Sequence, residues 1–121
     1  MRLLIYSQDG NGLGHLRRTG NIAQCVLGRV RDAAVLCVAD ARAIPAFAAQ
    51  PHVDFLKLPT LVKTGRDSSA EASWTLAALP LATREAVLLR SSLLRQTLEA
   101  FAPDVVLVDH MPVGALSLIH I

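Results

Sequence analysis

A glycine-rich stretch at residues 7–18, Ser-Gln-Asp-Gly-Asn-Gly-Leu-Gly-His-Leu-Arg-Arg, limits the possible folds of this chain more than any other segment. An apolar run at residues 3–6 precedes it, and a pattern typical of an amphipathic helix follows it. Strand, glycine turn and helix in this order are typical of a backbone that approaches a ligand. Glycine has no Cβ to block the approach, and the N-terminus of a helix attracts negative charge. The stretch therefore predicts a ligand-binding turn at the start of an α/β domain.

Apolar runs alternate with helical patterns along the rest of the chain. We expect strands at residues 2–7, 34–38, 53–59 and 105–108. We expect helices at residues 14–27, with Gly28 as the stop, and at 41–49 and 81–101. Residues 60–75 show little periodicity and are expected to form a loop. This alternation predicts an α/β fold, a Rossmann-like parallel sheet with helices on both faces, in which the strand at 53–59 lies near an edge and the strand at 105–108 is buried.

Two loops of this sheet are expected to meet. In such sheets the first and fourth strands commonly lie side by side where the winding reverses, and ligands bind outside their carboxyl ends. The glycine–histidine turn follows the first strand, and Asp109 and His110 follow the fourth. Both loops should therefore flank the same crevice.

Composition excludes several classes of protein. The chain has 121 residues, 52% of them apolar and 18% charged, which is typical of one domain with a buried core. A net charge of +2 without basic runs gives no support for a nucleic-acid partner. No window reaches the roughly 20 apolar residues of a membrane span, and the apolar start is too short for a signal peptide. Cys25 and Cys37 lack metal or redox spacing, so we expect two buried thiols in the reducing cytoplasm.

The glycine pattern leaves a dinucleotide interpretation open. A dinucleotide fingerprint needs G-x-G-x-x-G and an acidic residue about 20 residues later. Here His15 stands where the third glycine should be, although Asp40 could hold a ribose hydroxyl or, equally, cap a helix at 41–49. A phosphate-binding P-loop is excluded because no Gly-Lys-Ser/Thr follows the turn.

His15 and Asp109 are the candidates for chemistry. A neutral imidazole in the first turn of a helix can take a proton from a hydroxyl, or it can simply pack the turn. Asp109 can orient a histidine, hold a substrate hydroxyl, or cap a helix that begins near Pro112. Arg17 and Arg18 could balance an anionic ligand. The four histidines never fall at i, i+4 spacing, so no metal is expected.

Two segments carry a resemblance to a known family. Residues 10–18, Gly-Asn-Gly-Leu-Gly-His-Leu-Arg-Arg, and residues 101–110, Phe-Ala-Pro-Asp-Val-Val-Leu-Val-Asp-His, together resemble the N-terminal half of GT-B glycosyltransferases. Within these the chain looks most like the MurG-like glycosyltransferases. The resemblance implies two Rossmann-like domains facing a cleft, with the acceptor bound mainly by the N-terminal domain. The C-terminal domain would hold the nucleotide-sugar donor, and no metal or other cofactor is implied.

The resemblance also implies roles for residues. His15 would be the general base on the acceptor hydroxyl, and Asp109 would lie across the cleft as its catalytic partner. The residues that would bind substrate or donor phosphates are Gly10, Gly12, Gly14, Arg17, Arg18 and His110.

The chain departs from the family in its length and its end. Residues 1–121 would form a single, incomplete acceptor-side domain without the donor domain, inactive alone. Residues 116–121 form an apolar run where a polar helix start is expected, which indicates a non-native end.

The expected function is sugar transfer from a nucleotide sugar to an acceptor hydroxyl in the cytoplasm, at a membrane surface if the acceptor is a lipid. Two alternatives remain: a nucleotide- or dinucleotide-binding module of an oxidoreductase, and a non-catalytic piece that folds only with a partner domain.

Overall fold

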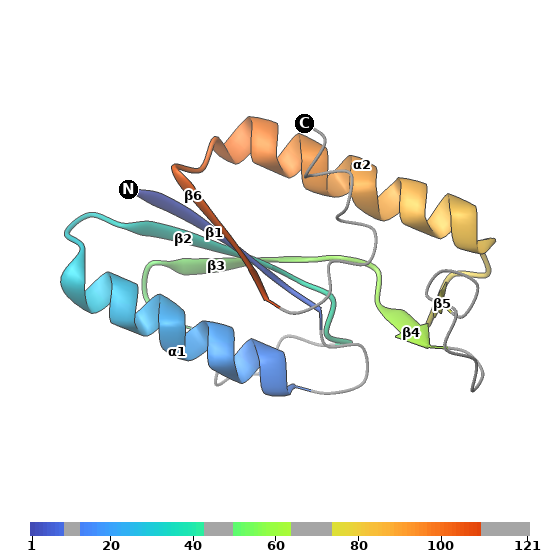
Figure 1. Ribbon diagram of the computed structural model, residues 1–121, viewed down its shortest axis with the longest axis horizontal. Coiled ribbons are helices and arrows are strands. Elements are labelled where there is room, and N and C mark those ends of the chain that lie inside the picture. Colours follow the sequence, from blue (N-terminus) through green and yellow to red (C-terminus); the bar gives the residue numbers. More distant parts are fainter. Residues whose placement is uncertain (9–12, 43–49, 64–73, 110–121) are drawn as a thin grey trace.

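The computed structural model describes residues 1–8, 13–42, 50–63 and 74–109. The elements, in chain order, are β1 (Arg2–Ser7), α1 (Gly14–Arg29), β2 (Ala34–Ala39), β3 (Val53–Lys57), β4 (Leu61–Lys63), β5 (Trp74–Leu76), α2 (Thr83–Phe101) and β6 (Val105–Asp109). Four strands form a parallel sheet in the order β3–β2–β1–β6, and β4 pairs with β5 in a separate antiparallel sheet (Figure 1). The predicted α/β, Rossmann-like fold is therefore confirmed.

The two helices pack on opposite faces of the parallel sheet (Figure 1). Successive side chains of a strand point to opposite faces, so an all-apolar strand needs cover on both. In β1, Leu4 packs in a cluster with Leu94 of α2, whereas Ile5 packs in a cluster with Ala23 of α1. Both strand residues are fully buried. The prediction of helices on both faces is confirmed.

The pairing of β1 with β6 positions the candidate site. The two strands run parallel, and Ser7 at the end of β1 lies opposite Asp109 at the end of β6. The expectation that the first and last predicted strands are neighbours is therefore confirmed. The edge position expected for β3 is confirmed as well, since β3 pairs only with β2 in the described sheet.

The prediction of a loop over residues 60–75 is wrong at both ends. Leu61 and Leu76 belong to β4 and β5, lie opposite each other in the antiparallel pair, and are buried. Strands of three residues are too short to show a periodicity, which explains why the sequence pattern did not indicate them. Residues 64–73 lie outside the described part.

The helix boundaries differ slightly from those expected. α1 continues through Gly28 to Arg29, so Gly28 is not its stop. α2 begins at Thr83 and ends at Phe101, after which Ala102 adopts a left-handed conformation with φ 47°. Most of the helix expected at residues 41–49 lies outside the described part.

Two expectations of burial are wrong. β6 is an edge strand of the described sheet, and Val105, Val106 and Val108 are 41–48% exposed instead of buried. Cys25 is exposed on α1, while Cys37 in β2 is buried as expected. Among the described helices, none has the length and apolar character that a membrane crossing requires.

Candidate functional site

The structure brings His15 and Asp109 together at the carboxyl end of the parallel sheet. His15 is the second residue of α1, and Asp109 is the last residue of β6. The Nδ1 atom of His15 lies 3.0 Å from Oδ2 of Asp109, within hydrogen-bond distance. The start of α1 and the carboxyl end of β6 thus lie side by side, as the strand order requires.

Arg18 joins this pair from the next turn of α1. Its Nη2 lies 2.7 Å from Oδ1 of Asp109, and its Nε donates to Oδ2 over 3.4 Å. This two-point contact fixes the plane of the carboxylate, because the guanidinium donors form a rigid fork. The side chain of Asp109 is 14% exposed and that of His15 is 28% exposed, so both remain open to a substrate.

Nδ1 of His15 lies between an acceptor and a donor. Oδ2 of Asp109 is 3.0 Å away and only accepts when ionised, whereas Nη2 of Arg18 is 2.9 Å away and only donates. Nη2 of Arg18 also donates to Oδ1 of Asp109 over 2.7 Å. In the tautomer with the hydrogen on Nδ1, the ring donates to Asp109 and its lone pair is on Nε2. This is the arrangement in which a histidine accepts a proton while an aspartate stabilises the resulting imidazolium.

The other predicted ligand residues are only partly placed. Gly14 is the first residue of α1, and a Cβ added there would meet nothing within 4 Å. Arg17 is exposed on α1. Gly10, Gly12 and His110 lie outside the described residues, as does a helix beginning near Pro112.

Asp40 is buried with a cationic partner. It has no exposed surface, its Oδ2 lies 3.5 Å from Nη1 of Arg90, and it accepts a hydrogen bond from the Leu61 amide. A residue that holds a ribose hydroxyl must reach a ligand, which this carboxylate does not. The cap at residues 41–49 cannot be assessed, since most of that segment lies outside the described residues.

Arg90 is the residue that the sequence analysis missed. It is fully buried on the face of α2 that also carries Ala86 and Leu94, at i, i+4 and i+8. Its Nη2 donates to the hydroxyl of Tyr6 over 2.7 Å, and Nη1 donates to the carbonyl of Pro59. The signal was a charged residue within an otherwise apolar i, i+4 stripe, which indicates a buried ion pair.

The hydroxyl of Tyr6 continues the network toward the glycine-rich turn by donating to Oε1 of Gln8 over 3.2 Å. Burial raises the pKa of Tyr6, and the nearby positive charge of Arg90 partly opposes that rise. The network links the carboxyl ends of β1 and β2 to α2. It therefore stabilises the carboxyl end of the sheet, where His15 and Asp109 also lie.

Within the residues that the structure describes, no group of three or more histidine, cysteine, aspartate or glutamate side chains could hold a metal ion. The described part of the site contains one imidazole, one carboxylate and one guanidinium in mutual contact. These groups can move a proton and balance an anion.

Comparisons with known proteins give no assignment for this arrangement. No protein-family model matches the chain, and no curated protein and no solved structure has significant similarity to it.

Proposed function

We propose that this chain is the acceptor-side domain of a glycosyltransferase, in which His15 is the general base. The observation that supports the proposal is the 3.0 Å contact between Nδ1 of His15 and Asp109. In the proposed state the hydrogen is on Nδ1, and Nε2 is the proton acceptor. The sequence resemblance of residues 10–18 and 101–110 to GT-B enzymes supplies the class of reaction. The fold is of the type that this class requires.

In the proposed step an acceptor hydroxyl gives its proton to Nε2 while its oxygen attacks the anomeric carbon of the donor sugar. The bond between that carbon and the donor phosphate breaks, and the nucleotide leaves with the bonding electrons. Asp109 stabilises the imidazolium that forms on His15, and Arg18 holds Asp109 in place. The positive end of α1 favours the negative charge on the leaving phosphate.

The dinucleotide alternative is less well supported. It depends on Asp40 as the ribose ligand, but that carboxylate is fully buried and lies beside Arg90. Titration with NAD(H) and with UDP-sugars separates the two proposals. Tight NAD(H) binding that is lost on Asp40→Ala substitution would favour the oxidoreductase module.

The decisive experiment measures nucleoside diphosphate release by the complete protein encoded at this locus, with nucleotide sugars and hydroxyl acceptors as substrates. His15→Ala should lower kcat by about 10²–10⁴-fold, the usual contribution of a general base. His52→Asn is the matched control, because His52 is exposed and precedes β3 at the opposite edge of the sheet. Asparagine is chosen because it tolerates the φ of 68° at this position. Wild-type turnover in His15→Ala would refute the role of His15, and no release with any donor would refute the reaction class.

A further inference from the structure

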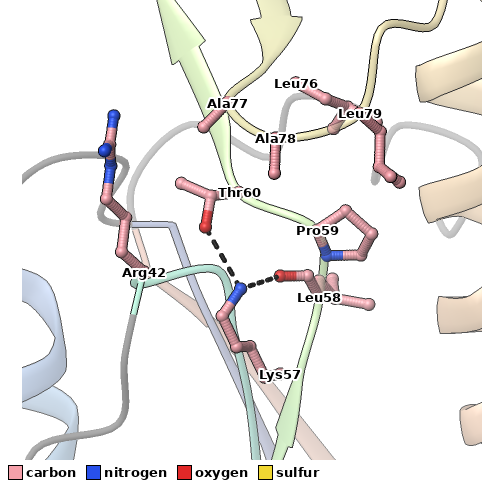
Figure 2. A pocket seen from close by; sticks show the side chains of 9 residues that line it. All are labelled: Arg42, Lys57, Leu58, Pro59, Thr60, Leu76, Ala77, Ala78 and Leu79. Carbon is pink, nitrogen blue, oxygen red and sulfur yellow. Dashed lines mark hydrogen bonds between the residues drawn. The ribbon is translucent and has the colours of Figure 1, made fainter.

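A hollow lies at the carboxyl end of β3, apart from the residues of the His15–Asp109 pair. It has a volume of about 470 Å³ and is lined by Arg42, by residues 57–60 and by residues 76–79. Figure 2 shows Lys57 and Arg42 on one side and the chain that follows β5 across from them. The volume is in the range of about 300–1,000 Å³ that small-molecule sites occupy.

The lining is mainly apolar. Leu58 and Leu76 are buried beneath the hollow, whereas Leu79 is 44% exposed at its surface. Pro59, Ala77 and Ala78 complete this apolar wall. An exposed leucine beside such a hollow leaves apolar surface in water, which a ligand with an apolar part would cover.

The described residues that line this hollow carry charges of one sign only. Lys57 donates from Nζ to the Leu58 carbonyl over 3.1 Å and to the Thr60 hydroxyl over 3.2 Å, so its charge is hydrogen-bonded but not neutralised. An ammonium group has three donors, which leaves one for a ligand. Arg42 is exposed, and within the described residues it has no carboxylate partner. Among the described residues that line the hollow, none is acidic.

We infer that this hollow binds an amphipathic anion, a small molecule with an apolar chain or ring and a terminal phosphate or carboxylate. The anionic group lies between Lys57 and Arg42, and the apolar part covers Leu58, Leu76 and Leu79. An apolar cavity with a few convergent polar groups is the usual form of a small-molecule site. The inference does not depend on the proposed transfer reaction, because none of its residues belongs to the His15 site.

The test is a titration of the ¹⁵N-labelled chain followed by amide chemical shifts. Octyl phosphate should produce saturable shifts of the amides of Thr60, Ala77 and Ala78. Inorganic phosphate lacks the apolar chain and octanol lacks the charge, so each should bind at least about tenfold more weakly. Octanoate separates the two head groups: tighter binding of octanoate assigns the site to carboxylates, and tighter binding of octyl phosphate assigns it to phosphates. Absence of saturable shifts at low-millimolar ligand would overturn the inference, as would octanol binding as tightly as octyl phosphate.

Two variants test the lining residues, with circular dichroism as the check on folding. Arg42→Gln should weaken octyl phosphate binding by about three- to tenfold through loss of one charged hydrogen bond. Leu79→Asp should weaken it by more than about tenfold, because it places a like charge beside the ligand. Arg31→Gln is the matched control, since Arg31 is equally exposed but lies between α1 and β2. If Arg42→Gln and Arg31→Gln weakened octyl phosphate binding equally, only the net charge of the protein would matter, and the inferred site would be refuted.

Discussion

At the scale of single residues, one carboxylate organises the candidate site. Asp109 contacts Nδ1 of His15 and two donors of Arg18, so its position is fixed from two turns of the same helix. The contact with the carboxylate orients the imidazole ring of His15.

The tautomer of His15 provides a prediction that needs no substrate. Ring ¹⁵N chemical shifts of the neutral protein should show His15 with its hydrogen on Nδ1. Asp109→Asn should move a substantial fraction of the hydrogen to Nε2, because an amide can donate to Nδ1 as well as accept from it. The ring of His52, which lies at the other edge of the sheet, should not change in the variant. A hydrogen on Nε2 in the unsubstituted protein would contradict the tautomer that the proposed function requires.

Part of this site could be predicted from the sequence. Parallel strands place the loops after residues 7 and 109 at one edge, so the nearness of His15 and Asp109 follows from strand order alone. The contacts of Arg18 cannot be predicted from strand order, because they depend on which face of α1 is turned toward β6. The pattern of residues 14–27 fixed only the apolar face of that helix.

At the scale of elements, Arg90 couples α2 to the sheet. A charge in the core is tolerated only when it is paired and hydrogen-bonded, and Arg90 meets Asp40, Tyr6 and the Pro59 carbonyl. Its Nε has no hydrogen-bond partner within the described residues. The network therefore gives α2 one specific position while contributing less to stability than a full set of hydrogen bonds would.

Arg90→Met should lower the free energy of unfolding by about 3–5 kcal/mol, because it keeps much of the side-chain volume but leaves the buried Asp40 without its cation. Arg95→Met on the exposed face of α2 is the control and should change it by less than about 0.5 kcal/mol. Urea unfolding followed by circular dichroism measures both. A similar loss of unfolding free energy in the two variants would show that the buried Arg90–Asp40 pair does not contribute more to stability than an exposed arginine does.

The elements that the sequence failed to predict share a physical reason. β4 and β5 have three residues each, too few for a period of two to be visible. The apolar run of β6 is typical of a buried strand, yet the strand lies at the edge of the described sheet. The valine-rich sequence of β6 indicates an extended segment, but it does not indicate whether the strand has one neighbouring strand or two.

At the scale of the whole molecule, the two faces of the sheet share a sensitivity to high pH. Cys37 is buried on the face covered by α1, and burial raises the pKa of its thiol to about 11. Tyr6 is buried on the face covered by α2, and burial raises the pKa of its hydroxyl as well. Both groups keep their protons in the folded state at a pH where the unfolded chain releases them.

The free energy of unfolding should therefore fall as the pH rises from about 8 to about 11, since the unfolded state binds fewer protons over this range. Below about pH 8 these two groups should contribute almost no pH dependence. Cys37→Ala should flatten the decline, whereas Cys25→Ala should leave it unchanged, because Cys25 is exposed. Urea unfolding at a series of pH values measures the slope, and identical slopes in the two variants would contradict the assignment.

The hydrogen bond between His15 and Asp109 joins residues 94 positions apart. During synthesis His15 leaves the ribosome long before Asp109, which follows α2 and is the last residue of β6. A shorter nascent chain lacks Asp109, so its imidazole does not have this contact even if β1, β2 and α1 have already associated. The arrangement of His15 and Asp109 can consequently form only in chains whose synthesis and sheet assembly have passed residue 109.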